Sequence, residues 1–290
     1  MNILITGSNG QLGKEFQKIA QTDRKHVWYF TDVDELDITN PTQLKHYLNA
    51  ENIEVCVNCA AYTAVDKAED EPEKAQLLNA QAPAFLAEAC KSANALLMHI
   101  STDYVFSGRH YMPYTEDHPV SPASAYAQGK ADGERNIMLS GANYMIIRTS
   151  WLYSITGNNF VKTMIRLGKE KESINVVADQ VGTPTYAFDL AATILLMVEN
   201  QDENSVNQIY HYSNEGAISW YDFAMAIMEL EKLDCKVIPI ESKDYPVKTV
   251  RPFYSVMNKA KIKSTFNITV PYWRDSLKKC LEEMNGQKQD

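Results

Sequence analysis

The sequence is short of positive charge. Its 290 residues include 28 lysines and arginines against 37 aspartates and glutamates, which gives a formal net charge of −9. Proteins that bind the nucleic-acid backbone gather Lys and Arg on one surface, so this balance argues against a nucleic-acid partner. The charge balance does not argue against a nucleotide ligand, because a diphosphate needs only a helix N-terminus or one arginine.

Long hydrophobic runs are missing too. No apolar stretch approaches the ~20 residues of a membrane span, and the chain begins with a strand-like segment at residues 2–5, without a basic leader or a cleavage site. The five cysteines are an odd number without the spacing of a disulfide framework, which suggests a reducing compartment. Cys56 and Cys59 lie in a strand-like run, so we expect core residues rather than a metal or redox pair. These absences predict a cytoplasmic protein with no membrane partner.

Motifs of hydrolases and metal sites are also absent. The sequence contains no G-x-S-x-G or H-E-x-x-H, which argues against a nucleophile-type hydrolase. Its six histidines show no metal-ligand spacing, so no metal ligand is assigned. His99 lies inside an apolar run and is expected to be a satisfied core residue rather than a catalyst.

A glycine-rich turn follows the first predicted strand. Residues 2–6 are predicted as a strand, the turn GSNGQLG spans residues 7–13, and a helix is expected to begin near its end. In that setting glycines let the backbone approach a pyrophosphate, and the helix N-terminus offers it free N–H groups. The spacing is G-x-x-G-x-x-G rather than the general G-x-G-x-x-G. Gly7, Gly10 and Gly13 are therefore candidate dinucleotide-binding residues.

Two aspartates follow the second predicted strand, residues 27–31. Asp32 stands about twenty residues after the glycine turn, where a carboxylate holds the adenosine ribose hydroxyls. No Lys or Arg directly follows it to receive a 2′-phosphate, so the sequence favours NADH and leaves NADPH open. Asp37 precedes a helix predicted to begin at Pro41, and it is either a helix-entry carboxylate or a cofactor ligand.

The third predicted strand, residues 55–58, ends in small side chains. Ala60 and Ala61 would let a flat ring or a ribose lie against the backbone, which makes them candidate cofactor contacts. Residues 66–94 are rich in Ala and Glu and are predicted as two helical stretches, broken near Pro83.

The candidate catalytic group combines a hydroxyl, a carboxylate, a phenol and an ammonium. Residues 96–100 are predicted as a buried strand, so Thr102 and Asp103 leave its carboxyl end, where open α/β sheets place their ligands. Tyr126 and Lys130 are four residues apart and share one face of a helix. An ammonium one turn away favours the phenolate, so Tyr126 can exchange a proton near neutral pH. Beside a dinucleotide, these groups predict hydride transfer at a carbon that bears oxygen.

In that reaction Tyr126 would give its proton to the carbonyl oxygen, and Thr102 would hydrogen-bond the same oxygen. Lys130 would lower the pKa of the phenol and hold the nicotinamide ribose. Asp103 and Trp151, both at strand ends, would help to seat the substrate, although a tryptophan there serves the core about as often.

The order of elements predicts an α/β fold. Five strands alternating with helices, the last at residues 144–148, indicate a Rossmann-type doubly wound parallel sheet. Residues 1–150 would form this NAD(P)-binding domain, with residues 187–212 returning to it. A smaller C-terminal substrate-binding lobe would comprise residues 151–186 and 213–290.

Several segments resemble known enzymes. The glycine turn, NCAAYTAVDKAE at 58–69, STDYVF at 101–106 and YAQGK at 126–130 resemble the extended short-chain dehydrogenase/reductases. Within that superfamily the chain resembles the dTDP-4-dehydrorhamnose reductase family almost end to end. The segments that carry this narrower resemblance are RTSWLY at 148–153, GNNFVKTM at 157–164, DQVGTPT at 179–185, SWY at 219–221 and RPFYS at 251–255.

The resemblance implies reduction of the 4-keto group of dTDP-4-dehydro-β-L-rhamnose by NADPH or NADH. The product, dTDP-L-rhamnose, would supply bacterial surface polysaccharide. The cofactor contacts that it implies by position are Gly10, Gln11, Leu12, Asp37, Ile38, Ala61, Tyr62, Thr63 and Lys130. The substrate contacts that it implies are Thr102, Asp103, Tyr126 and Trp151, with Lys130 shared.

Some members of the family bridge a dimer with Mg²⁺ through acidic side chains. Here Glu15 and Glu283 match two of the positions, but Phe188 stands at the third and only its neighbour, Asp189, is acidic. Mg²⁺ is therefore not assigned, and both a monomer and a homodimer stay open.

Two other interpretations stay open. An epimerase or dehydratase acting on nucleotide sugars would share the superfamily motifs, but dehydratases carry Asp and Glu after the threonine, whereas Tyr104 follows Asp103 here. A non-catalytic regulatory subunit, resembling that of methionine adenosyltransferase, would hold a dinucleotide without turnover. The intact set of Thr102, Tyr126 and Lys130 favours an enzyme.

Overall fold

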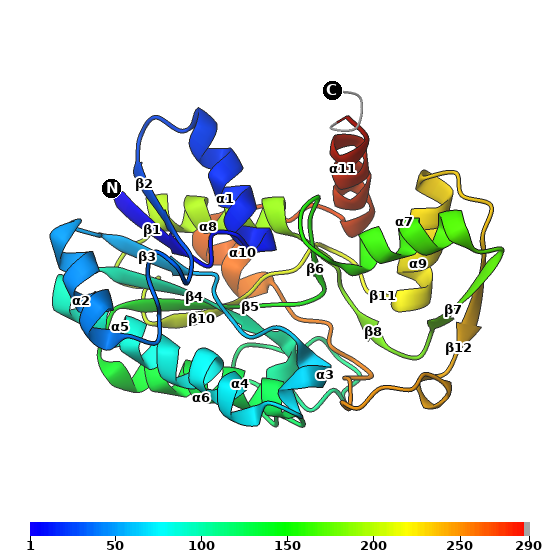
Figure 1. Cartoon of the computed structure of the whole chain (residues 1–290), viewed down its shortest axis with the longest axis horizontal. Helices are drawn as coiled ribbons and strands as arrows, with labels where there is room; N and C mark the ends of the chain where they lie inside the picture. The colour runs from blue at the N-terminus through cyan, green and yellow to red at the C-terminus, as the bar shows by residue number, and fades with distance from the viewer. Residues whose placement is uncertain (287–290) are drawn as a thin grey trace.

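The structure is a computed structural model that describes residues 1–286 (Figure 1). Residues 287–290, the end of the expected substrate lobe, where the sequence predicts a frayed tail, lie outside the described residues. Within the described part of the chain, no helix is long and apolar enough to cross a membrane.

Six parallel strands form the central sheet, in the order β10-β5-β4-β3-β1-β2. The middle strands are apolar because helices cover both faces of the sheet, so each of their side chains is enclosed. The predicted Rossmann-type fold class is confirmed. The strands are β1 (Asn2–Thr6), β2 (Val27–Thr31), β3 (Val55–Asn58), β4 (Leu96–Thr102), β5 (Tyr144–Thr149) and β10 (Gln208–His211).

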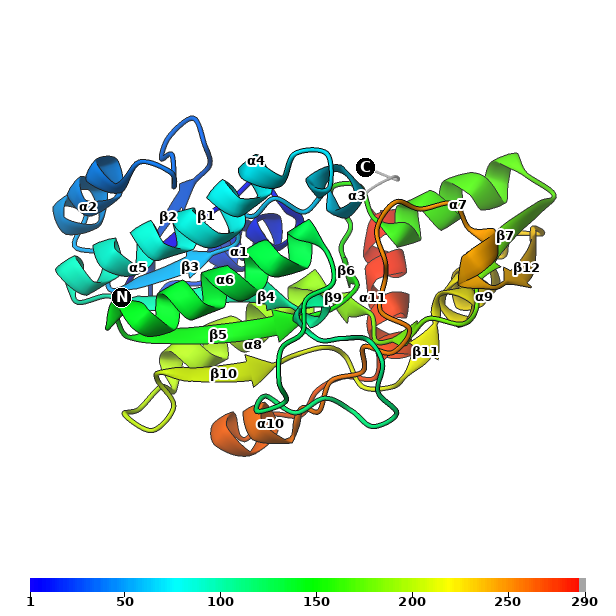
Figure 2. The same ribbon diagram turned by 90° about the horizontal axis from the view of Figure 1, so that it is seen from below.

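Two helix layers enclose the sheet (Figures 1 and 2). Helices α1, α8 and α10 cover one face, and α2, α5 and α6 cover the other. Both layers bury aliphatic side chains against the strands, which accounts for the strongly apolar run in α8. The bounds are α1 (Gln11–Thr22), α2 (Pro41–Ala50), α5 (Ala82–Ala93), α6 (Ala125–Ser140), α8 (Ala187–Glu199) and α10 (Ala260–Phe266).

The break predicted near Pro83 is wrong. Helix α4 (Pro72–Gln76) continues through a π-helical turn, η1 (Leu77–Gln81), directly into α5. Pro83 therefore lies in the first turn of α5, and the π turn before it adjusts the hydrogen-bond pattern to the missing N–H. The separate short helix in this region is α3 (Val65–Ala68).

The remaining elements form a smaller lobe, on the right of Figure 1. It has its own apolar core, which includes Phe223 and Trp273. The division into domains drawn from the sequence stays a prediction. The elements are β6 (Leu152–Tyr153), α7 (Phe160–Glu170), β7 (Ser173–Val177), β8 (Val181–Gly182), β9 (Thr185–Tyr186), β11 (Ile218–Ser219), α9 (Trp220–Leu230), β12 (Lys236–Ile240) and α11 (Trp273–Gly286).

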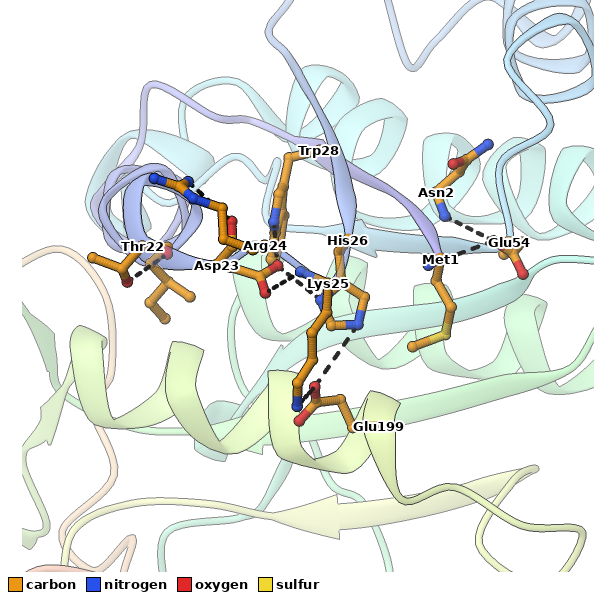
Figure 3. A network of polar contacts seen from close by, with 11 residues as sticks. Met1, Asn2, Thr22, Asp23, Arg24, Lys25, His26, Trp28, Glu54 and Glu199 are labelled. Atoms are coloured by element: carbon orange, nitrogen blue, oxygen red, sulfur yellow. Dashed lines mark hydrogen bonds and ion pairs between the residues drawn. The ribbon is translucent and has the colours of Figure 1, made fainter.

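A polar network anchors the edge strand β2 to helix α8 (Figure 3). Asp23 accepts hydrogen bonds from Trp28 Nε1 at 2.7 Å and from the Lys25 backbone at 3.0 Å, and it lies 2.8 Å from His26 Nδ1. Burial alone would raise the pKa of Asp23, but these hydrogen bonds outweigh burial and lower the pKa to about 2. Lys25 also pairs with Glu199 at the end of α8, at 3.0 Å. The network thereby fixes the amino-terminal end of β2, opposite the end of the strand where the glycine turn lies.

Candidate active site

A cleft opens at the carboxyl ends of β1, β3 and β4, where the order of strands reverses and open α/β sheets bind ligands. Its volume is about 930 Å³, at the upper end of the range for ligand pockets. Of the residues chosen from the sequence, Gly13 and Tyr62 lie outside its lining. Those that line it are Gly7, Gly10, Gln11, Leu12, Asp32, Asp37, Ile38, Ala60, Ala61, Thr63, Thr102, Asp103, Tyr126, Lys130 and Trp151.

The glycine turn brings β1 and α1 to the floor of this cleft. Gly7 has a φ of +62°, and a Cβ there would lie 2.7 Å from the Ala60 backbone, so a side chain would separate the two loops. A Cβ on Gly13 would lie 2.5 Å from Ser8, so Gly13 allows the turn to pack on α1 rather than line the cleft. Gly10 precedes α1 without a side-chain cap, which leaves the first-turn N–H groups of the helix to a ligand.

The two acidic residues at the outer end of the cleft are held by hydrogen bonds from the glycine turn and from their own loops. Asp32 accepts hydrogen bonds from the backbone of Asn9 at 3.0 Å and of Val33 at 2.9 Å. Asp37 accepts from the backbone N–H and the hydroxyl of Thr39, at 2.8 and 2.7 Å. Asp37 is thus part of the turn before α2, where the sequence suggested a helix-entry carboxylate. It also lines the cleft, so a contact with the cofactor stays a prediction.

Tyr62, in the loop after β3, lies outside the lining of the cleft. Asn79 in the π turn accepts from the Tyr62 backbone at 2.8 Å and donates to it at 3.0 Å, which fixes the loop. The Tyr62 hydroxyl donates to Glu71 at 2.9 Å. Ala60 and Ala61 line the cleft, and their role as cofactor contacts stays a prediction.

Thr102, Asp103 and Tyr126 meet at the inner end of the cleft. The Thr102 hydroxyl donates to Asp103 Oδ1 at 3.0 Å and accepts from the Tyr104 backbone at 3.2 Å. Burial raises the pKa of Tyr126 to about 12, against a hydrogen bond with Thr102 that lowers it. Burial likewise raises the pKa of Asp103 to about 6. At neutral pH Tyr126 is therefore a protonated phenol, able to donate.

Lys130 is buried beside the end of β4. Its Nζ donates to the carbonyl of Ile100 at 2.5 Å and lies 3.5 Å from Nε2 of His99. Burial lowers the pKa of Lys130 to about 8, and the nearby carboxylate of Glu134 partly opposes that effect. In this arrangement the ammonium binds strand β4, and the expectation that Lys130 makes Tyr126 more acidic stays a prediction.

Trp151 closes the cleft on the side of the smaller lobe. Its φ of 47° is unusual for a bulky residue. The indole stacks on Trp220 with ring centroids 3.5 Å apart, and a Cβ on Gly182 would lie 2.7 Å from it. The strained backbone and the close packing hold the indole in one orientation at the edge of the cleft.

A family model described as the RmlD substrate binding domain matches residues 1–285. The chain belongs to this family. A dTDP-4-dehydrorhamnose reductase of Aggregatibacter actinomycetemcomitans is 38% identical, covering 95% of this chain and 97% of the relative. The spore coat polysaccharide biosynthesis protein SpsK of Bacillus subtilis is 37% identical, covering 98% of each chain.

Solved structures agree with this membership. A dTDP-4-dehydrorhamnose reductase of Clostridium acetobutylicum is 42% identical, with a TM-score of 0.92 over 98% of this chain and 100% of that one. The dTDP-4-dehydrorhamnose reductase of Bacillus anthracis, solved in complex with NADP, is 38% identical, with a TM-score of 0.92 over 97% and 99%. The resemblance drawn from the sequence motifs is confirmed.

The residues of this family member do not fit the bridging Mg²⁺ that the resemblance implies for some reductases. The Lys18 ammonium pairs with Glu283 and lies 4.7 Å above the ring of Phe188. Asp189 accepts hydrogen bonds from Asn214 and Ser276 instead. Among residues 1–286 no group of three His, Cys, Asp or Glu side chains is placed to hold a metal ion.

Several residues that line the cleft of this family member were not predicted from the sequence. Lys74 places a cation there, on helix α4, which begins at Pro72. Gly157 and Asn158 come from the loop before α7 in the smaller lobe. Their segment was recognised in the resemblance, but its distance from the glycine turn in the chain gave no sign of contact.

Proposed function

We propose that this protein reduces the 4-keto group of dTDP-4-dehydro-β-L-rhamnose to a hydroxyl, forming dTDP-L-rhamnose. The observation that carries the proposal is that Thr102, Tyr126 and Lys130 line the same cleft as the glycine turn. The names of the reductases from Aggregatibacter and Clostridium support this substrate. The resident cofactor would be NADPH or NADH, in keeping with the NADP complex of the Bacillus anthracis reductase.

A bound NADPH or NADH would provide the hydride that the carbonyl carbon receives in the proposed reaction. Tyr126 donates its phenolic proton to the carbonyl oxygen, where negative charge develops. A phenol with a pKa of about 12 stays protonated until an alkoxide, which is a stronger base, forms beside it. Thr102 hydrogen-bonds the same oxygen and orients it, and Trp151 limits where the sugar ring can lie. Lys130 would hold the nicotinamide ribose and return a proton to Tyr126.

The defining assay is oxidation of NADPH or NADH with dTDP-4-dehydro-L-rhamnose, followed by identification of the sugar product. Tyr126→Phe is expected to lower kcat/KM by about 10²–10⁴-fold, because the general acid is lost. Its affinity for NADPH, measured by fluorescence titration, should stay close to that of the wild type. Tyr114→Phe is a matched control, since it removes the hydroxyl of another buried tyrosine, outside the cleft lining.

Turnover of the keto sugar by Tyr126→Phe at the wild-type rate would exclude Tyr126 as the acid. Tight NADPH binding by the wild type without any turnover would favour a dinucleotide-binding regulatory protein. An interconverted sugar with no net cofactor oxidation would favour an epimerase.

The carboxylate of Asp32, at the outer end of the cleft, bears on the choice between NADH and NADPH. Asp32 places a carboxylate where ribose hydroxyls bind, and a 2′-phosphate there would be repelled. We expect NADH to be used at least as well as NADPH in kcat/KM, and Asp32→Ser to shift the ratio towards NADPH. A strong NADPH preference in the wild type would mean that Asp32 does not face the ribose.

The product would enter bacterial surface polysaccharide, and the name of the Bacillus subtilis relative is consistent with such a role. Nucleotide sugars are made from cytoplasmic nucleotides, so we place the enzyme in the cytoplasm. It would act as a monomer or a homodimer.

A further inference from the structure

A row of polar side chains crosses three strands beneath the cleft. Thr6, Asn58 and His99 are register partners on β1, β3 and β4, so their side chains lie side by side in an otherwise apolar sheet. The Thr6 hydroxyl donates to Asn58 Oδ1 at 2.8 Å, and Asn58 Nδ2 lies 3.0 Å from His99 Nδ1. The row ends at Lys130, whose Nζ lies 3.5 Å from His99 Nε2. All four residues are at most 2% exposed.

The orientation of the Asn58 amide is fixed by a backbone group. The N–H of Ala60, which can only donate, lies 3.2 Å from one terminal atom of Asn58. That atom must be Oδ1, so the atom that faces His99 is Nδ2, which also can only donate. Nδ1 of His99 must therefore accept, and the proton of the neutral imidazole lies on Nε2.

This tautomer places an N–H opposite Lys130. An ammonium offers only donors, so it cannot bond to Nε2–H, whereas a neutral amine accepts from Nε2–H with its lone pair and still donates to Ile100. Protonation of His99 would bring a second N–H against Asn58 Nδ2, and burial and the charge of Lys130 also lower the pKa of His99 well below its usual range. His99 therefore stays neutral.

We propose that His99 is a positioning residue for Lys130: held as its Nε2–H tautomer by Asn58, it directs the Lys130 side chain and favours the neutral amine. The other groups that face Lys130 are Glu134 on its own helix and Cys59 after β3, and both favour the ammonium. His99 and burial oppose them, which keeps Lys130 able to lose and regain a proton near neutral pH. For its kinetic consequences, this inference rests on the proposed reduction.

Asn58→Asp tests the inference by reversing the tautomer of His99. A carboxylate at position 58 still accepts from Thr6 and Ala60, but its second oxygen would draw the proton of His99 to Nδ1. Nε2 would then accept from the Lys130 ammonium, so the pKa of Lys130 should rise by about one unit. In His99→Phe the N–H is removed altogether, so the pKa should rise as well. His211→Phe is the matched control, because His211 is equally buried on the far strand β10.

Two measurements report the result. Nitrogen-15 NMR of the histidine side chains in the wild type should show His99 with Nδ1 unprotonated and Nε2 protonated between pH 6 and 8. The alkaline limb of kcat/KM, which reflects the free enzyme, should move to higher pH in Asn58→Asp and His99→Phe, and stay in place in His211→Phe. The pH dependence of NADPH binding should shift in the same direction.

A proton on Nδ1, or an imidazolium signal in this pH range, would overturn the assignment. The assignment would also be overturned if the alkaline limb of kcat/KM stays in place or moves to lower pH in Asn58→Asp and His99→Phe. The same holds for the pH dependence of NADPH binding. If one of these variants does not fold, the NMR result and the other variant decide. If the wild type binds NADPH but reduces no keto sugar, the proposed function fails, while the NMR and binding measurements still test His99.

Discussion

Replacing Arg148 by methionine should destabilise this protein strongly, because the change leaves a buried carboxylate without its partner. Arg148 on β5 donates from Nε to Glu134 Oε1 at 2.9 Å and from Nη2 to Oε2 at 2.7 Å, and both residues are only 2% exposed. Removing one partner of such a pair costs about 3–5 kcal/mol. That is a large share of the ~5–15 kcal/mol that keeps a domain folded.

The double variant Arg148→Met/Glu134→Leu separates the charge effect from packing. With both charges gone, no uncompensated ion stays buried, and such replacements are often neutral in stability. Ser101, which donates to Glu134 at 2.5 Å, then loses its acceptor, at a cost of about 1 kcal/mol. We therefore expect the double variant to be more stable than Arg148→Met and to fall below the wild type by roughly that 1 kcal/mol.

Urea unfolding at pH 7, followed by circular dichroism, measures these differences. Arg166→Met is the control, because Arg166 pairs with Glu170 on the surface, where both side chains are more than half exposed and the pair contributes ~0–1 kcal/mol. The reasoning is refuted if Arg148→Met costs no more than this surface control. It is also refuted if the double variant is less stable than Arg148→Met.

Two further predictions concern a buried carboxyl group and a partly buried indole. Burial raises the pKa of Glu15 to about 7, from 4.5 in the unfolded chain, so this residue contributes stability below pH 4.5 that is lost as the pH rises towards 7. Glu15→Gln should therefore gain about 3 kcal/mol over the wild type in urea unfolding at pH 8 and little at pH 4.5, and an equal effect at both would contradict it. Trp220→Ala removes the support of the Trp151 indole, so KM for the keto sugar should rise up to about 10-fold with KM for NADPH unchanged; a parallel rise in both would show general damage.

The strands were the most predictable part of the fold. Apolar runs such as residues 96–100 are short, continuous and bounded by polar residues, and this pattern is typical of a strand buried on both faces. The break expected at Pro83 shows the limit of that reasoning. A proline marks an interruption of the hydrogen-bond pattern, but the sequence does not say whether the chain stops there or absorbs the missing N–H in a π turn.

The candidate site was predictable where a residue's role depends on its own strand or turn. Gly7, Thr102 and Tyr126 line the cleft because they stand at the end of a strand or on the helix that follows it. Tyr62 does not, because Asn79 and Glu71, which lie on other elements, decide where its backbone and ring point. The contact between His99 and Asn58 likewise depends on the register of β3 and β4, which the sequence does not state.

A chain of net negative charge can still bind an anionic cofactor when backbone N–H groups hold the diphosphate. The charged side chains that line the cleft are Asp32, Asp37, Lys74, Asp103 and Lys130, which is no cationic pocket. A diphosphate there must be held mainly by N–H groups, and α1 provides them, because Gly10 leaves its first turn without a side-chain cap. Dipoles fixed by the fold need no lysine or arginine. A net charge of −9 therefore argues against binding to a polyanion, but it is compatible with binding of one dinucleotide.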